Sequence, residues 1–283
     1  MDKEFINIRK IFAEKSPKLA KYIPGFIYRF LEKLVHQQQV NQTIATGKHL
    51  DGIGFAKHTL KNMGVTVQLI GLQNIPLQGG IIMASNHPLG GMDGMTFLEG
   101  VAHIRTDIKC IVNDILMKLP NFEDVFVPVN KVGATTREAL QLIDDTFAKP
   151  EAILVFPAGL CSRKINGEIK DIEWQKSFIT KAVKYQKNII PVYMSGQNSA
   201  RFYRISKWRK FFNIKANLEM LTLVDEMYKQ KGNTLQIIFG QPIPYLCFTK
   251  NKKDAAWAQL VRAFIYTLPK QPLASFTQFV NNQ

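Results

Sequence analysis

The chain has 283 residues, of which 46% are hydrophobic and 21% are charged, a composition typical of a globular protein and not of a disordered or collagen-like chain. This length predicts one large domain or two small ones, with enough core to fold without disulfides. The three cysteines are scattered and form no CxxC pair, and no apolar stretch reaches the roughly 18 residues of a membrane-spanning helix. The first residues also lack a secretory signal pattern, and no P-loop or G-x-G-x-x-G motif follows an apolar run. We therefore expect an intracellular protein with no bound cofactor or metal.

The strongest feature of the composition is its positive charge. Lys and Arg number 37 against 22 Asp and Glu, a formal net charge of +15, which favours an anionic partner. Residues 201–215 contain basic and aromatic residues but no acidic one. Aromatic rings favour the membrane interface, where each nearby cation contributes about 1 kcal/mol on an anionic surface. This segment predicts an anionic membrane surface as partner. Single-stranded nucleic acid and a plain solvated helix are the alternatives.

The first 50 residues read as a helical extension. Apolar residues recur at helical spacing between Phe26 and Val35, while Pro17 and Pro24 interrupt the pattern. Two or three short helices are therefore expected here, either on the membrane surface or packed against the rest of the protein. We divide the chain into this extension, residues 1–50, and a second domain formed by residues 51–283.

From about residue 64 the pattern changes to short apolar runs that alternate with helical segments. The runs predict strands at Val65–Leu72, Ile81–Ser85, Ile108–Val112, Val125–Val129, Ala152–Phe156, Ile189–Met194 and Leu235–Phe239. The segments between them predict helices at Met95–His103, Thr135–Phe147, Trp174–Tyr185, Leu218–Tyr228 and Ala255–Tyr266. Several runs are apolar throughout, as in strands that are buried on both faces. The alternation predicts an α/β fold with a mostly parallel sheet flanked by helices.

Polar, glycine-containing segments follow three of the predicted strands, at residues 86–94, 157–164 and 195–201. Ligands of open α/β sheets bind at the carboxyl ends of the strands, so these segments are the candidate site. The first contains His87 and Asp93. A carboxylate on one ring nitrogen of a histidine fixes its tautomer for general-base catalysis. The alternatives are that Asp93 only caps the following helix, or that Cys161 is a thiol nucleophile activated by His87, as in a thioesterase or hydrolase.

Three motifs occur in a characteristic order: Asn86-His87 followed by Asp93, then Phe156-Pro157-Ala158-Gly159, then Ile190-Pro191-Val192. Together they resemble the phospholipid/glycerol acyltransferase superfamily, whose members carry N-H-x4-D, F-P-E-G-T-R-S and V-x-P-V blocks in this order. The resemblance covers roughly residues 65–245. Here five residues separate the histidine from the aspartate, and Ala158 replaces the family's glutamate, which argues against a glycerol-3-phosphate head group. The residues of the motifs are most similar to the bacterial hemolysin-type branch, which includes O-acyltransferases of ornithine- and glycine-type aminolipids.

The resemblance implies direct acyl transfer from the thioester of acyl carrier protein or coenzyme A to the hydroxyl of a lyso-lipid, either a lyso-aminolipid or a lysophosphatidate. His87 would be the general base and Asp93 its partner. The residues expected to contact substrate are Asn130, Lys131, Gly159, Ser162, Arg163 and Arg201. The resemblance and the charge together imply a peripheral protein at the cytoplasmic face of the inner membrane that has no nucleic-acid partner.

Overall fold

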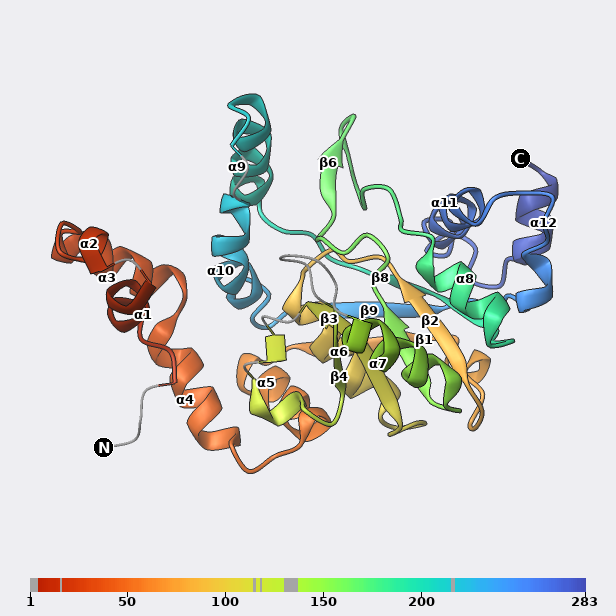
Figure 1. The fold of residues 1–283 in the computed structure, drawn as a ribbon, viewed down its shortest axis with the longest axis horizontal. Coiled ribbons are helices and arrows are strands. Elements are labelled where there is room, and N and C mark those ends of the chain that lie inside the picture. Colours follow the sequence, from red (N-terminus) through yellow and green to blue (C-terminus); the bar gives the residue numbers. More distant parts are fainter. Residues whose placement is uncertain (1–4, 16, 114–115, 118, 130–136, 215–216) are drawn as a thin grey trace.

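The computed structural model describes residues 5–15, 17–113, 116–117, 119–129, 137–214 and 217–283. Seven strands form one sheet in the order β1-β9-β8-β2-β5-β3-β4 (Figure 1). They are β1 (Thr66–Ile70), β2 (Ile81–Ser85), β3 (Ile108–Asn113), β4 (Phe126–Val129), β5 (Ala152–Val155), β8 (Ile189–Met194) and β9 (Thr234–Phe239). Neighbouring strands pair in parallel except for β8 and β9, which are antiparallel. The predicted α/β fold with a mostly parallel sheet is confirmed.

Helices cover both faces of the sheet because alternate strand residues point to opposite sides. In β2, Ile82 and Ala84 belong to one core cluster, whereas Ile81 and Met83 belong to another. The first cluster includes residues of α7 (Arg137–Ala148), α8 (Ser177–Lys184), α11 (Asp254–Ile265) and α12 (Phe276–Asn281). The second includes residues of α5 (Gly52–Met63), α6 (Gly91–Val101) and the short helix η3 (Pro120–Phe122). The strand runs are thus apolar throughout because both of their faces are buried.

The N-terminal helices lie at one end of the molecule, and α11 and α12 lie at the other (Figure 1). The described part of this extension forms four helices, more than the two or three predicted: α1 (Ile8–Lys15), α2 (Pro17–Ala20), α3 (Gly25–Leu34) and α4 (Gln37–Gly47). The extra break falls at His36, whose φ of 47° is left-handed and separates α3 from α4. The His36 ring stacks on Tyr228 at 4.2 Å, and its Nε2 lies 3.0 Å from Asp225, so this break is fastened to α10 (Leu223–Tyr228).

Two elements project from the body on the same side (Figure 1): a hairpin of β6 (Arg163–Ile165) and β7 (Glu168–Lys170), and helix α9 (Ala200–Phe211). The hairpin was not predicted. Its turn is formed by Asn166 and Gly167, both with positive φ. The helix predicted at Leu218–Tyr228 is instead the short 3-10 helix η4 (Leu218–Thr222) followed by α10. Within the described part of the chain, no helix combines the length and apolar character needed to cross a bilayer.

Candidate active site

Three loops meet at one edge of the sheet because β8, β2 and β5 are neighbours that run in the same direction. Each loop follows the carboxyl end of its strand, as predicted. The backbone N–H of Ser162, after β5, donates to the carbonyl of His87, after β2, at 2.8 Å. The amide of Asn198, after β8, donates to the carbonyl of Pro88 at 3.0 Å. The structure therefore brings the three predicted segments together around His87.

Asn86 locks two of these loops to each other. Its side-chain amide donates to the carbonyl of Met194 at 2.8 Å and accepts the N–H of the same residue at 2.7 Å. Asn86 is buried, and both polar atoms of its side-chain amide are hydrogen-bonded to the end of β8 in place of water. The residue before His87 is thereby held by the neighbouring strand, which restrains the start of the loop.

His87 and Asp93 lie in direct contact. The Nδ1 of His87 is 2.9 Å from Oδ2 of Asp93, and this oxygen also accepts the backbone N–H groups of Leu89 (2.8 Å) and Gly90 (3.0 Å). Gly90 directly precedes helix α6 and has a φ of 76°, a conformation that glycine adopts without strain. Asp93 therefore both caps α6 and holds the imidazole, so the two interpretations of Asp93 are compatible.

The ring of His87 is positioned on its faces as well as at Nδ1. It stacks on Phe156, the residue after β5, with ring centroids 4.1 Å apart. The His87 side chain remains 17% exposed, whereas that of Asp93 is 2% exposed. With Nδ1 facing the carboxylate, Nε2 is the nitrogen that remains for an exchangeable proton of a ligand. This arrangement is suited to a general base whose tautomer is set by a buried carboxylate.

Burial and hydrogen bonding act in opposite directions on Asp93. Burial raises the pKa of its carboxyl above the ordinary value, and the bonds from His87, Leu89 and Gly90 oppose that rise. A charged carboxylate in this position is stabilised mainly by its three donors. The hydrogen bond from His87 thus replaces part of the water that the carboxylate loses on burial, and the same bond orients the His87 ring.

Ser162 and Gly159 lie beside His87 but use their polar groups internally. The Ser162 hydroxyl donates to Asp171 at 2.6 Å and the side chain is buried. Gly159 adopts a φ of 63° and its N–H donates to the carbonyl of Phe156 at 2.9 Å, which closes the turn after β5. Both residues thus shape the loop that packs on His87, because the Ser162 hydroxyl and the Gly159 N–H both donate to groups of the protein itself.

Arg163 is placed in the interior and not on an open surface. Its guanidinium donates to Glu219 at 2.9 Å and to the carbonyl of Cys161, and it stacks on Phe202 at 5.1 Å. Arg209 of α9 lies 2.9 Å from the same carboxylate. Arg163 and Glu219 are both buried, so this triad joins the hairpin, α9 and η4. The expectation that Arg163 contacts substrate is at odds with this geometry, because the guanidinium is buried and paired with Glu219.

The remaining predicted substrate contacts are placed differently. Arg201, in the first turn of α9, forms ion pairs with Asp225 and Glu226 of α10, and its side chain is 40% exposed. It therefore fastens α9 to α10. Asn130 and Lys131 directly follow β4 and lie outside the described residues.

Cys161 does not have the setting of a nucleophile. It is 1% exposed, and burial together with the nearby charge of Asp93 raises the pKa of its thiol to about 12. A thiolate nucleophile needs an electropositive and accessible environment, which lowers its pKa. The structure thus contradicts the thioesterase or hydrolase interpretation built on Cys161. The residue packs with Phe202 and Tyr203 in a small core cluster instead.

Sequence reasoning overlooked Asp171 and Trp174. Both are buried, and the Asp171 carboxylate binds the backbone of His87 from 84 positions away in the chain. No motif or spacing marks this contact, because it forms only when the segment after the hairpin folds back onto the first loop. The turn at Asn166-Gly167 is the one local signal that indicates this return of the chain.

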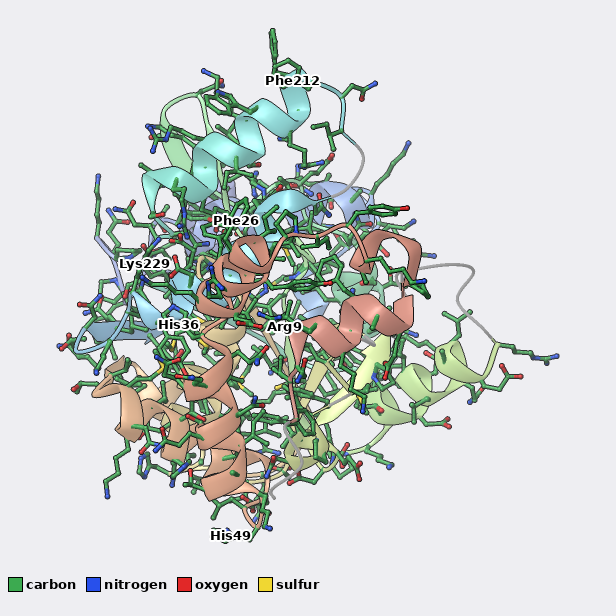
Figure 2. All side chains as sticks on the ribbon, turned by 90° about the vertical axis from the view of Figure 1, so that its left-hand side faces the viewer. Arg9, Phe26, His36, His49, Phe212 and Lys229 are labelled. Carbon is green, nitrogen blue, oxygen red and sulfur yellow. The ribbon has the colours of Figure 1, made fainter. Side chains whose placement is uncertain are left out.

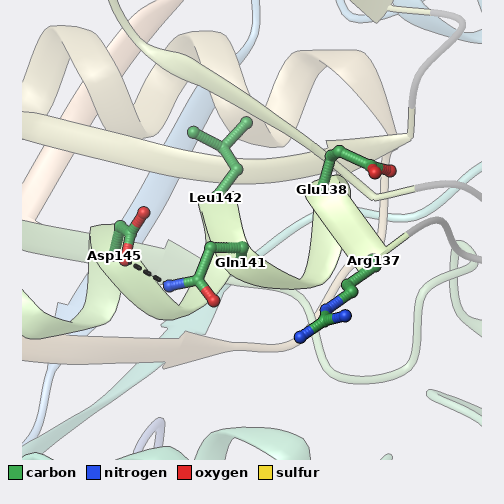
Figure 3. A pocket seen from close by; sticks show the side chains of 5 residues that line it. All are labelled: Arg137, Glu138, Gln141, Leu142 and Asp145. Carbon is green, nitrogen blue, oxygen red and sulfur yellow. Dashed lines mark hydrogen bonds between the residues drawn. The ribbon is translucent and has the colours of Figure 1, made fainter.

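A pocket elsewhere on the described surface is separate from the loops around His87. A shallow pocket of about 430 Å³ lies on α7, lined by Arg137, Glu138, Gln141, Leu142 and Asp145 (Figure 3). The amide of Gln141 donates to Asp145 at 2.7 Å across it. None of its lining residues belongs to the three loops around His87. Within the described residues, no group of three or more His, Cys, Asp or Glu side chains is arranged to hold a metal ion.

Comparison with known proteins agrees with the motifs. The sequence model of the acyltransferase family matches residues 10–270. Two lyso-glycine lipid O-acyltransferases, from Bacteroides thetaiotaomicron and Phocaeicola vulgatus, are each 38% identical over 265 residues, covering 93% of this chain and 97% and 95% of theirs. The crystal structure of the 1-acyl-sn-glycerophosphate (LPA) acyltransferase PlsC from Thermotoga maritima aligns with a TM-score of 0.49 at 15% identity, covering 86% of this chain and 96% of that one. The predicted resemblance is confirmed by the family match, and the chain belongs to the acyltransferase family.

Proposed function

We propose that this acyltransferase moves a fatty acyl group from an acyl thioester to the hydroxyl of a lyso-lipid, with His87 as general base and Asp93 as its partner. The observation that carries the proposal is the 2.9 Å contact between Nδ1 of His87 and Oδ2 of Asp93, in a loop at the carboxyl edge of the sheet. The donor is the thioester of acyl carrier protein or coenzyme A.

The reaction follows from the orientation of the imidazole. Nε2 of His87 removes the proton of the acceptor hydroxyl while the hydroxyl oxygen attacks the thioester carbonyl carbon. The carbon–oxygen bond forms, the carbonyl becomes an oxyanion, and collapse of this intermediate breaks the carbon–sulfur bond. The imidazolium then returns its proton to the departing thiolate, which leaves as the thiol. Asp93 stabilises the imidazolium through both steps. The donors proposed for the oxyanion are the backbone N–H groups of Leu160 and Cys161, since those of Gly159 and Ser162 already bind backbone carbonyls.

The proposed acceptor is a lyso-glycine lipid. It is supported by the names of the two relatives at 38% identity, which align along nearly their whole length. It is also supported by the sequence of the second motif, where Ala158 stands in place of the acidic residue of the superfamily pattern. A lysophosphatidate is the second acceptor, and the two are separated by competition in one assay.

The test uses the purified enzyme with a lyso-glycine lipid and either acyl carrier protein or coenzyme A thioester, with lysophosphatidate as the competing acceptor. General-base catalysis contributes about 10²–10⁴-fold, so His87→Ala should lose that factor in kcat. His103→Ala is the matched control, because His103 follows the end of α6, is 58% exposed and lies 3.6 Å from Glu99 on the outer surface. Near wild-type acyl transfer by a folded His87→Ala enzyme would refute the proposal. Loss of one lipid class in a deletion strain would name the acceptor directly.

We also propose that the protein docks peripherally on an anionic membrane, the cytoplasmic face of the inner membrane, through α9 and the extension of residues 1–50. Trp208, Phe211 and Phe212 at the end of α9 are 65%, 80% and 65% exposed, and Phe26 of α3 is 65% exposed. In Figure 2, Phe212 projects at the tip of α9 above Phe26. Exposed aromatic residues beside cations are typical of a membrane interface.

The ion pairs of α9 reduce the charge that this surface offers. Arg201 and Arg209 are paired with acidic residues of α10 and η4, whereas Arg204, Lys207 and Lys210 are exposed. Three cations contribute about 3 kcal/mol at an anionic surface, so the aromatic side chains must supply much of the binding.

Co-sedimentation with vesicles of phosphatidylglycerol and phosphatidylcholine, against phosphatidylcholine alone, tests the membrane proposal. The double variant Trp208→Ser/Phe211→Ser should lose binding to anionic vesicles. Leu273→Ser is the matched control, since Leu273 is 69% exposed near the other end of the molecule. Unchanged sedimentation of the double variant would contradict the proposal, and retardation of an oligonucleotide without vesicle binding would support the nucleic-acid alternative.

A further inference from the structure

A second buried carboxylate lies behind the loop of His87. Oδ1 of Asp171 accepts the backbone N–H of His87 at 3.2 Å and the hydroxyl of Ser162 at 2.6 Å, and Oδ2 accepts the indole N–H of Trp174 at 2.8 Å. The Asp171 side chain is fully buried. It therefore cannot touch a substrate, but it binds the loop after β2 and the loop after β5 with the same oxygen.

The main chain of Asp171 is fixed independently. Its N–H donates to the Tyr266 hydroxyl at 2.7 Å, and its carbonyl accepts Arg262 of α11. The main chain of Asp171 is thus anchored to Arg262 and Tyr266, whereas its carboxylate binds the loops after β2 and β5. Burial raises the pKa of the Asp171 carboxyl, and the donors Ser162, Trp174 and His87 oppose that rise. Three donors facing the two oxygens are the surroundings of a carboxylate that is kept charged.

We propose that Asp171 is a positioning residue for acyl transfer: it holds the backbone of His87 against the Ser162 loop and places a second negative charge that favours the imidazolium form of His87. This inference rests on the proposed role of His87. His87 thus contacts two carboxylates with different tasks, one at its ring and one at its main chain. Asp93 orients Nδ1, and Asp171 fixes the main chain from which the ring projects.

Other charged and titratable groups lie near Asp93 and Asp171, and a substitution of Asp171 leaves all of them in place. Within the described residues, those that face Asp171 from the packed elements are Asp93 of α6, Cys161 after β5, Arg163 of β6, Arg262 of α11 and Tyr266 directly after α11. Arg163 is paired with Glu219, and the Cys161 thiol, with a pKa of about 12, is neutral. A change in the pH dependence of kcat/KM after substitution of Asp171 can therefore be assigned to the lost charge of Asp171.

Asp171→Asn is the first test, measured as kcat and KM from pH 5 to pH 9. Because the charges of Asp171 and His87 attract each other, removal of the Asp171 charge should lower the pH of half-maximal kcat/KM, by about one unit. The plateau of kcat should fall about tenfold, since one pH unit of differential interaction corresponds to about a factor of ten. KM should change little, because Asp171 does not reach the substrate. Asp171→Glu, which restores the charge, should bring the pH of half-maximal rate back toward the wild-type value.

Ser162→Ala tests the holding role separately and keeps the proposal open to refutation if Asp171→Asn does not fold. It breaks the link between Asp171 and the β5 loop while the charge stays in place. Loss of one hydrogen bond should lower kcat about threefold to tenfold with an unchanged pH of half-maximal rate. The control is Asp144→Asn, which removes a carboxylate that binds Lys181 on the outer surface of α7 and α8 and should leave kcat, KM and the pH profile as in the wild type.

Two outcomes would overturn the inference. One is an Asp171→Asn enzyme that folds and keeps the wild-type pH profile, and the other is a Ser162→Ala enzyme with wild-type kcat. Both are distinct from failure of the proposed function, which is tested by His87→Ala: an inactive His87→Ala enzyme together with an unmoved Asp171→Asn profile refutes only the role of Asp171. An active His87→Ala enzyme refutes the proposed function itself.

Discussion

Substitution of Asp93 by Asn separates the charge of this carboxylate from its hydrogen bonds. A single oxygen, Oδ2, receives the His87 ring and the N–H groups of Leu89 and Gly90. In the variant, the amide oxygen should occupy that position, because an NH₂ group there would face two backbone donors. The contact to Nδ1–H is then kept, and with it the tautomer that leaves Nε2 to accept a proton.

The Asp93→Asn enzyme should therefore be slower because the negative charge is lost, and not because His87 adopts the wrong tautomer. An opposite charge at this distance favours the charged form of a partner by about 1–3 pH units, equivalent to about 1.4–4 kcal/mol. We expect the kcat value of Asp93→Asn to fall about 100-fold. Asp93→Ala should lose more, and it should also lower the free energy of unfolding by about 2–4 kcal/mol, because two buried N–H groups at the start of α6 lose their acceptor.

The assay compares turnover by both variants with that of the wild type, together with urea unfolding from pH 4 to pH 8. Burial raises the pKa of Asp93 in the folded state above its ordinary value of 3.8, so the wild type loses stability as the pH rises above that value. Asp93→Asn lacks this loss, and its stability relative to the wild type should increase between pH 4 and pH 7. Turnover reduced by a factor of about 10⁴ or more would show that the tautomer has changed. Unchanged turnover would remove Asp93 from the reaction altogether.

Three further predictions concern the thiols, a tight turn and the buried triad. In the folded protein a thiol reagent should label Cys247 and spare Cys161, and Cys161→Ala should keep acyl transfer; an acyl-thioester trapped on Cys161 would contradict this. Gly71→Ala should cost about 1–3 kcal/mol or more in urea unfolding, because φ is 80° and the added Cβ would lie 2.1 Å from the Phe239 carbonyl oxygen. Glu219→Ala should cost about 3–5 kcal/mol by the same measurement, since its two arginine partners lose their buried counter-charge; a loss below about 1 kcal/mol would show that the triad is dispensable.

The strands were the most predictable part of the fold. Ile81–Ser85 and Ile189–Met194 have the predicted bounds, because a run that is buried on both faces is apolar from end to end. The direction in which strands pair could not be predicted in the same way, because nothing in the composition of β9 shows that it is antiparallel to β8. The hairpin of β6 and β7 was missed because each strand has three residues, too few to show a period.

The site divides in the same way between local and distant contacts. His87 and Asp93 are separated by a few residues and could be paired from the sequence, because the loop that joins them is short and contains glycines. Asp171 and Glu219 act through contacts with residues far away in the chain, which no local pattern records. Arg163 shows the resulting error: a basic residue near the motif was expected to face a ligand, but a distant glutamate draws it into the interior.

The antiparallel pairing of β8 and β9 also determines which surface is farthest from the chemistry. Since β1 is parallel to β9, it runs against β2, and the segment of residues 71–80 that joins them crosses the edge opposite to His87. Leu77 in this segment is 75% exposed. A surface linker attached there would hold the protein with the edge that carries His87 turned outward, so immobilised protein can be presented to supported bilayers in one defined orientation.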